Sequence, residues 1–202
     1  MLRLLMRLFV ALDIGETIRE RIAAFVKEVC AFAPGVRWIA AESLHVTLKF
    51  IGERPDATVR NLEEGLRKIS APAFQISFRG CGFFPTEKSA RVFWIGIDAG
   101  SALPQLAKQI EAELVLRGIE AERRAFSPHL TLARAGSGSG APARQPGDRP
   151  NPRFSALQAK LPAMPPPDFG TMNANEFFLY RSQLSSRGAQ YSKIARFALS
   201  QE

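Results

Sequence analysis

The sequence predicts an α+β fold built mostly from antiparallel strands, and three observations support this class. Short strand-like segments are interspersed with a few amphipathic helices, without the regular strand–helix rhythm of a parallel sheet. Turn signals between neighbouring strands indicate frequent hairpins. An internal repeat divides the chain into two halves. We therefore expect one bilobal domain over residues 1–202, with two lobes related by a pseudo-twofold axis, helices outside and a central cleft.

The repeat consists of a buried strand that ends in Asp, an amphipathic helix and a second strand. The first strand ends at Asp13 and is followed by a predicted helix over about residues 16–32, and the second ends at Asp98 before a helix over about 102–117. Asp13 and Glu16 have the spacing of a capping box at the start of the first helix. The two halves therefore share one order of elements.

The last strand of each half opens with the same four-residue frame, H-x-T-L. It occupies residues 45–48 and 129–132, and the chain has no other histidine. Because side chains alternate along a strand, the His and the Thr share one face and the Leu lies on the other. Each frame would mount an imidazole and a hydroxyl on a strand that packs on the core, and the pseudo-twofold axis would bring both to the cleft.

The other helices and strands are predicted from the same periodicity of apolar residues. A helix is predicted over about residues 56–69, and strands over about 74–82, 91–97, 154–160, 175–182 and 191–199. A segment over about 135–152, rich in Gly, Ser and Pro, is typical of a mobile loop.

Composition limits the classes of function. The net charge of +8 and a pI of about 10.1 favour an anionic partner, nucleic acid first, although an Arg-rich soluble surface has the same effect. Arg3, Arg7 and Asp13 interrupt the apolar N-terminal run, which predicts a first strand from about Arg7 rather than a signal peptide. No stretch reaches membrane-spanning length. Cys30 and Cys81 lack metal-ligand spacing. We expect a cytoplasmic monomer with no membrane association and no metal site.

Two imidazoles that face one pocket form a general acid–base pair at neutral pH. One takes a proton from water, and the other gives a proton to a leaving oxygen. The hydroxyls of Thr47 and Thr131 beside them suit the non-bridging oxygens of a phosphate. The residues therefore predict hydrolysis of a small or terminal phosphodiester by direct attack of water, with no cofactor required.

Two basic residues near the frames are candidate substrate contacts. Lys49 is four residues after His45, so period two places it on the histidine face, where it would add positive potential; a solvated strand-end lysine is equally compatible. The same alternation sends Arg134 to the face opposite His129, where a structural ion pair is at least as plausible as substrate contact.

Aromatic residues near the frames are further candidates. Trp38 and Phe84 could stack on a nucleobase, and Tyr191 is a further candidate substrate contact. Core packing is favoured for Trp38 and for Phe84, whereas Tyr180 and Tyr191 are ambiguous.

The paired H-x-T-L frames lie within longer stretches of sequence that resemble those of a known protein family. These are residues 7–12 (RLFVAL), 37–38 (RW), 42–53 (ESLHVTLKFIGE), 82–85 (GFFP), 91–94 (RVFW), 126–134 (FSPHLTLAR), 179–182 (LYRS) and 188–191 (GAQY). Over nearly its whole length the chain resembles the two-histidine (2H) phosphoesterase superfamily. It is most similar to the branch of RNA 2′,3′-cyclic phosphodiesterases, also called the 2′-5′ RNA ligase family.

This resemblance implies hydrolysis of an RNA or nucleoside 2′,3′-cyclic phosphate to a 2′-phosphomonoester, without metal or cofactor. It implies that His45 is the proton donor to the departing 3′ oxygen and His129 the proton acceptor that activates water. The near-identical frames do not themselves set this polarity. Two alternatives stay open, namely 2′-5′ ligation or RNA-end trimming at the same site, and a non-catalytic basic RNA-binding protein, against which the intact frames weigh.

Overall fold

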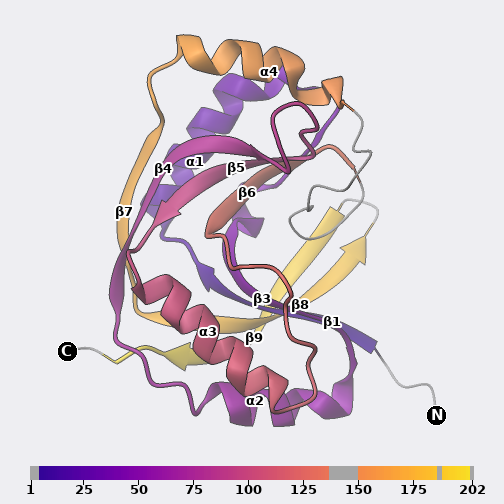
Figure 1. Cartoon of the computed structure of the whole chain (residues 1–202), viewed down its shortest axis with the longest axis vertical. Helices are drawn as coiled ribbons and strands as arrows, with labels where there is room; N and C mark the ends of the chain where they lie inside the picture. The colour runs from indigo at the N-terminus through magenta and orange to yellow at the C-terminus, as the bar shows by residue number, and fades with distance from the viewer. Residues whose placement is uncertain (1–4, 137–149, 186–187, 201–202) are drawn as a thin grey trace.

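The computed structural model of this chain describes residues 5–136, 150–185 and 188–200. It confirms the predicted α+β class, with two antiparallel sheets and a small number of helices around them (Figure 1). The central part of the predicted loop, residues 137–149, lies outside the described residues. Among those described, no helix combines the length and the apolar composition needed to cross a bilayer.

Sheet A has four strands, and every neighbouring pair is antiparallel. The spatial order is β3-β1-β8-β9. The strands are β1 (Leu5–Asp13), β3 (His45–Pro55), β8 (Glu176–Ser185) and β9 (Gly188–Ala198).

Sheet B has five antiparallel strands in the order β2-β6-β5-β4-β7. They are β2 (Arg37–Trp38), β4 (Phe74–Phe84), β5 (Val92–Asp98), β6 (His129–Arg134) and β7 (Asp168–Ala174). The orders β3-β1-β8-β9 and β6-β5-β4-β7 are equivalent, so the internal repeat is visible in the topology. The sheets are not sequential halves of the chain, because β4 from the first half joins sheet B and the last two strands join sheet A.

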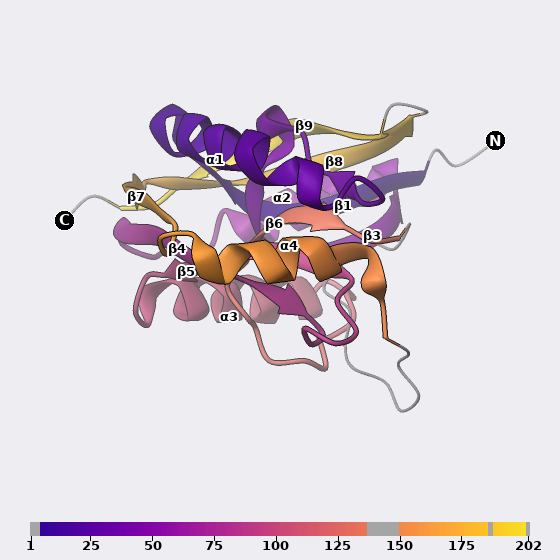
Figure 2. The same ribbon diagram turned by 90° about the horizontal axis from the view of Figure 1, so that it is seen from above.

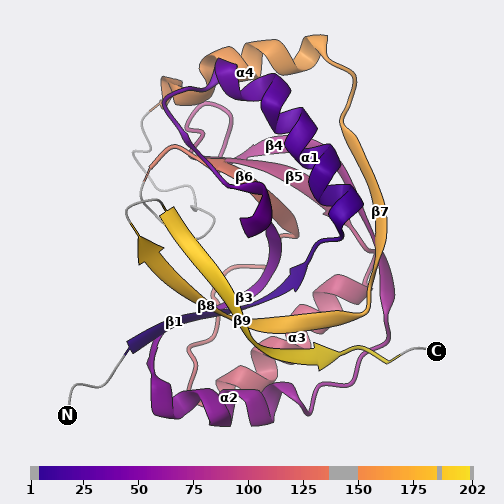
Figure 3. The same cartoon turned by 180° about the vertical axis from the view of Figure 1, so that it is seen from behind.

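Each helix of the repeat packs against the other half. Helix α1 (Glu16–Val29) places Phe25 against Phe93 of β5 and Phe169 of β7, with ring centroids 6.4 and 5.3 Å apart. Helix α3 (Ala102–Val115) contacts β3 of sheet A and α2 (Val59–Leu66). The two long helices lie on opposite sides of the molecule (Figures 2 and 3). The helix predicted over residues 56–69 is shorter, because its first turn is a 3₁₀ helix.

One predicted element has the wrong type, and the strands β2 and β7 were not predicted. Residues predicted as a strand near 154–160 form helix α4 (Ser155–Lys160), which follows a short 3₁₀ turn. Its buried Phe154 and Leu157 are three residues apart, and Ala, Gln and Lys between and after them favour helix. Strand β7 was not predicted, because Gly170 and Asn173 weaken its strand pattern.

The start of α1 also differs from the capping box that Asp13 and Glu16 predict. Gly15 is the N-cap residue and no side chain caps the helix. Asp13 instead accepts a hydrogen bond from the amide of Ile14 and forms an ion pair with Arg19, 2.8 Å away.

The apolar core is divided by sheet A. The main cluster lies between the sheets and helices and includes Leu8, Phe78 and Phe93. A second cluster contains Phe9, Ala11, Phe178 and Tyr180, with Tyr191 packed against it. Because Phe9 and Ala11 alternate with residues of the main core, the second cluster lies on the opposite face of β1.

Candidate active site

The two histidine frames meet where the sheets approach each other. Strand β3 of sheet A contacts β6 of sheet B, and each of these strands begins with its histidine, His45 or His129. The charge of the His129 ring also lowers the pKa of His45, so the two imidazoles are close enough for their charges to influence each other.

Both imidazoles are held by the same kind of bond. His45 Nδ1 lies 2.8 Å from the carbonyl oxygen of Ser43, and His129 Nδ1 lies 2.7 Å from that of Ser127. Because a carbonyl oxygen only accepts, Nδ1 carries a proton in each ring. Nε2 is then the titrating atom, an acceptor in the neutral ring and a donor in the protonated one.

The first frame contains a β-bulge. The ladder between β1 and β3 pairs Ala11 with Thr47 and Val10 with Lys49, so Leu48 has no partner of its own. An unpaired extra residue shifts the alternation by one, and the residues beyond it change face.

The second frame contains a bulge at the same position. The ladder between β5 and β6 pairs Trp94 with Thr131 and Phe93 with Ala133, which leaves Leu132 as the extra residue. The last Leu of both frames is therefore bulged, and simple period-two counting fails beyond it.

The bulge corrects the prediction for Lys49. Its side chain lies on the core face and is only 6% exposed. The ammonium group is 2.8 Å from Glu111 Oε2 and donates to the carbonyl oxygen of Glu120 at 2.8 Å. Lys49 therefore fastens β3 to α3. It also lines a pocket beside His129, so its contact with substrate stays a prediction. The fifth residue after His45, Phe50, takes the histidine face instead and contacts Phe9.

The bulge also corrects the placement of Arg134. It lies on the same face as His129, and its guanidinium Nη2 is 3.4 Å from the hydroxyl of Thr131. Its positive charge lowers the pKa of both His45 and His129. The hydroxyl of Tyr191 in turn acts on Arg134, raising its pKa against the effect of burial. Arg134 and Tyr191 therefore belong to the neighbourhood of the two imidazoles.

Burial dominates the titration of both imidazoles. It lowers the pKa of His45 to about 4; the bond to Ser43 and the charge of Asp13 act in the opposite direction without overcoming it. Burial likewise lowers the pKa of His129. Burial favours the uncharged form of an imidazole. In the free protein His45 is neutral at pH 7, because the charge of Asp13 does not offset the effect of burial.

Aromatic rings enclose each imidazole. His45 lies 4.8 Å from Phe9 and 5.0 Å, edge-on, from Tyr191, while His129 lies 5.0 Å, edge-on, from Phe84. Phe84, for which core packing was predicted, is therefore next to the site. Phe9 was not anticipated, although its alternation with Leu8 and Val10 on β1 was a usable signal.

Trp38 is partly buried and packs with the main core. Its ring is edge-on to the buried Phe93, 6.0 Å away, and its indole nitrogen donates to the carbonyl oxygen of Ala33. The packing that the sequence favoured for Trp38 is the one observed, and its contact with substrate stays a prediction.

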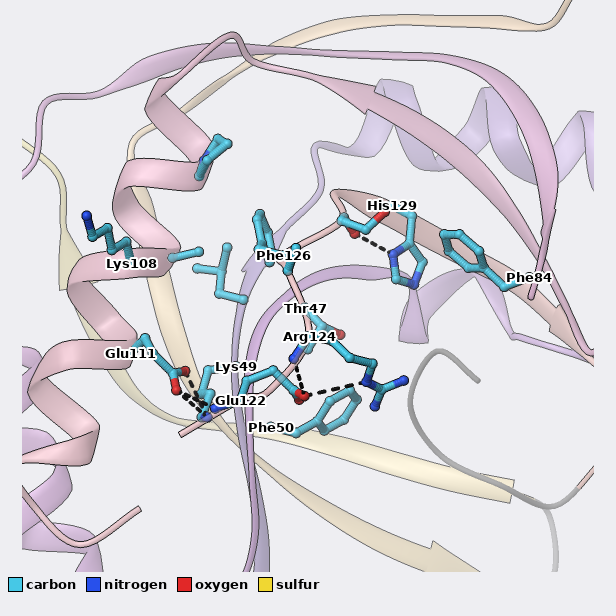
Figure 4. Close-up of a pocket in the computed structure, with 15 residues that line it drawn as sticks. Thr47, Lys49, Phe50, Phe84, Lys108, Glu111, Glu122, Arg124, Phe126 and His129 are labelled. Atoms are coloured by element: carbon cyan, nitrogen blue, oxygen red, sulfur yellow. Dashed lines mark hydrogen bonds and ion pairs between the residues drawn. The ribbon is translucent and has the colours of Figure 1, made fainter. Parts of the chain in front are cut away.

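A pocket of about 380 Å³ begins beside His129 and Thr47. Figure 4 shows Phe50, Arg124 and Phe126 around it, with Glu111 and Lys108 of α3 at the far end. Sequence reasoning missed these lining residues, because most of them come from irregular chain or from the bulged strand. Among the described residues, no group of three or more acidic, Cys or His side chains is arranged to hold a metal ion.

Comparison with known proteins gives one consistent family. The model of the LigT like Phosphoesterase family matches residues 12–94 and again 95–191, so each match contains one histidine frame. A relative from Archaeoglobus fulgidus named RNA 2′,3′-cyclic phosphodiesterase is 33% identical and spans 95% of this chain and 99% of its own length. One of the same name from Thermus thermophilus is 32% identical over 96% and 90%.

The fold leads to the same group. The crystal structure of E. coli LigT complexed with 3′-AMP has a TM-score of 0.76 and 29% identity, and the match covers 98% of this chain and all of that one. The resemblance that the sequence suggested is confirmed: the chain belongs to the LigT-like phosphoesterase family of the 2H phosphoesterase superfamily.

Proposed function

We propose that this protein is an RNA 2′,3′-cyclic phosphodiesterase that forms a 2′-phosphomonoester without metal or cofactor. The observation that carries the proposal is the pair of interacting imidazoles, each with Nδ1–H bonded to a backbone carbonyl and Nε2 left to exchange a proton. The names of the relatives support the same activity.

In the proposed reaction the cyclic phosphate lies between the two rings. His129 Nε2 takes a proton from water as the oxygen attacks phosphorus, the bond from phosphorus to the 3′ oxygen breaks, and His45 Nε2 gives that oxygen a proton. The hydroxyls of Thr47 and Thr131 bind the non-bridging oxygens, and Arg134 compensates their charge.

Nearby charged groups support the assignment of His45 as the proton donor and His129 as the proton acceptor. Asp13 raises the pKa of His45, whereas no carboxylate figures among the influences on the pKa of His129. A nearby carboxylate favours the protonated ring, as a proton donor requires. Burial outweighs Asp13 in the free protein, and we expect the bound phosphate anion to reverse that balance.

The surroundings of the imidazoles support a nucleotide substrate. The pocket beside His129 is large enough for a small ligand and has the exposed ring of Phe50, 41% exposed, in its wall. Aromatic faces in a positively charged surface bind nucleobases well. The net charge of +8 further favours an RNA end.

The test is product analysis with a 2′,3′-cyclic mononucleotide in the presence of EDTA. We expect the 2′-phosphate as the product, and loss of turnover in His45→Ala and in His129→Ala. A 3′-phosphate would overturn the leaving-group assignment. Turnover that persists in both variants would overturn the mechanism, and salt-sensitive RNA binding without any turnover would favour the non-catalytic alternative.

The pocket beside His129 supports a second candidate at the same site. A 5′ hydroxyl in place of water would give a 2′-5′ linkage, with His129 again taking the proton of the attacking oxygen. Rates measured side by side on a cyclic mononucleotide, and on a cyclic-ended RNA with a 5′-hydroxyl partner, distinguish hydrolysis from ligation.

A further inference from the structure

Arg19 of α1 links three parts of the chain next to His45. Its guanidinium Nη2 donates to Asp13 Oδ1 at 2.8 Å and to the carbonyl oxygen of Ile14 at 3.1 Å. Its Nη1 donates to the carbonyl oxygen of Ala41. The side chain is 14% exposed, so these bonds are largely shielded from water.

The bond to Ala41 fixes the turn that supports His45. Ala41 opens the 3₁₀ helix Ala41–Ser43, and its carbonyl oxygen also accepts from the amide of Leu44 at 3.2 Å. Ser43 closes this helix and provides the carbonyl oxygen bonded to His45 Nδ1. Arg19 therefore holds the start of the turn whose last residue, Ser43, sets the tautomer of the imidazole.

Asp13 anchors the other side of Arg19. It is the ladder partner of His45 between β1 and β3, so its backbone is fixed relative to the histidine. Its carboxylate also accepts from the amide of Ile14 at 2.8 Å and from the ammonium group of Lys193. Because several donors share this carboxylate, the guanidinium has a rigid counterion.

The carbonyl that supports His129 is held in another way. Ser127 lies in irregular chain. Bonds that join this segment to strand β3 and helix α3 are at Glu120, whose carbonyl oxygen accepts from Lys49, and at Glu122, whose amide donates to Glu111 at 2.7 Å. The two frames, nearly identical in sequence, thus differ in what holds their imidazoles.

We propose that Arg19, held by Asp13, is a positioning residue that keeps His45 with Nδ1–H on Ser43 and Nε2 toward the scissile phosphate. The significance of this device for catalysis rests on the proposed function, in which His45 donates the proton. The claim that Arg19 fixes the tautomer of His45 does not rest on that function, because the tautomer is measurable without any substrate.

The tautomers are measured by ¹⁵N NMR of the histidine rings in the tag-free protein. The chain has only two histidines, so His129→Asn assigns both sets of signals. The variant is Arg19→Met. The matched control is Arg21→Met, which removes a guanidinium two residues away on the same helix whose recorded bond is to the carbonyl oxygen of Phe169.

In Arg19→Met we expect an Nε2–H population to appear for His45 while the His129 signals stay unchanged. We expect kcat on a 2′,3′-cyclic nucleotide to fall by up to about a hundredfold, with little change in KM, because the proton donor is misplaced rather than the binding groups. Arg21→Met should leave the tautomers and kcat as in the parent protein. Low concentrations of guanidinium should restore the Nδ1–H form in Arg19→Ala.

A folded Arg19→Met protein whose His45 keeps the Nδ1–H form would overturn the proposal. Circular dichroism establishes folding; if Arg19→Met does not fold, Arg19→Lys takes its place. A single ammonium group cannot bridge Ala41 and Asp13 as the guanidinium does, so a partial shift of the His45 tautomer is expected and an unchanged tautomer counts against the proposal. Absence of turnover in the parent protein would contradict the proposed function alone.

Discussion

The guanidinium of Arg134 lies 3.4 Å from the hydroxyl of Thr131. Thr131 shares the face of His129 by the ordinary alternation of a strand, and the bulge at Leu132 brings Arg134 to the same face. The equivalent bulge in the first frame delivers Phe50, an aromatic ring, to the corresponding position. One backbone device thus brings a cation to one side of the site and an apolar ring to the other. The two halves of the repeat therefore share the same backbone bulge, but they place side chains of different chemistry next to the site.

Replacing Arg134 by Met should reduce kcat/KM for a 2′,3′-cyclic nucleotide by about a hundredfold or more, because a preorganised cation at the phosphate is lost. The same change should raise the pKa of both histidines, since the positive charge of Arg134 lowers them in the parent protein. NMR titration measures that shift independently of turnover. Arg60→Met, which removes an equal charge from an exposed helix position, should change neither. Unchanged histidine pKa values in Arg134→Met would show that the guanidinium acts elsewhere.

Sequence reasoning reached the fold class, the repeat and the meeting of the two frames, because these depend on periodicity and spacing. It could not place the residues beyond each frame. Period-two counting assumes an unbroken ladder, and the bulges at Leu48 and Leu132 are set by pairing with β1 and β5. For that reason Lys49 and Arg134 were assigned to the wrong faces.

The errors in secondary structure have a related origin. Residues 154–160 form too short a segment for apolar periodicity to distinguish a strand from a helix. Burial of both Phe154 and Leu157, three residues apart, favours the observed helix α4. The support of His45 by Arg19 was not predictable either. It depends on contacts between α1, β1 and a 3₁₀ turn that only the tertiary structure brings together.

The hydroxyls of Thr47 and Thr131 should matter for binding of the phosphate. Thr→Val keeps the shape and the β propensity and removes only the hydroxyl. We expect each variant to lose about tenfold to a hundredfold in kcat/KM, with nearly unchanged thermal stability. Thr171→Val is the matched control, because this hydroxyl of the edge strand β7 bonds to Ser77 on the neighbouring strand β4 of sheet B. Full activity in both site variants would argue against phosphate binding by the hydroxyls.

Lys49 should be a stability residue rather than a catalytic one. Lys49→Met removes the cation from its ion pair with Glu111 and leaves a partly buried carboxylate, 28% exposed, without its partner. We expect the free energy of unfolding to fall by about 2 kcal/mol in urea titrations, less than for a fully buried pair. The double variant Lys49→Met, Glu111→Leu should recover only part of that loss, because Glu111 also accepts a hydrogen bond from the amide of Glu122. Breaking the exposed pair of Arg60 with Glu64 by Arg60→Met should cost under about 1 kcal/mol.

An anion at the site should raise the pKa of His45. In the free protein burial and the positive charges of Arg134 and His129 hold that pKa at about 4. A bound phosphate adds negative charge to that of Asp13, so NMR titration with and without inorganic phosphate should show an upward shift of the His45 pKa. The shift should be smaller in the Thr47→Val, Thr131→Val double variant. A His45 pKa that does not respond to phosphate would place the anion elsewhere.

Acid should destabilise the protein through His45 in a defined pH range. Its pKa is about 4 in the folded protein, against 6.5 as the ordinary value. The unfolded chain therefore binds more protons between these two values. Stability is fully present above pH 6.5 and is lost as the pH falls toward 4, by on the order of 3 kcal/mol. Other groups, His129 and Asp13 among them, also contribute to the acid response. The measurement is therefore a difference between urea titrations of the parent and of His45→Gln at several pH values. The variant should lose less stability than the parent over this range, and parallel curves would show that His45 titrates normally in the folded protein.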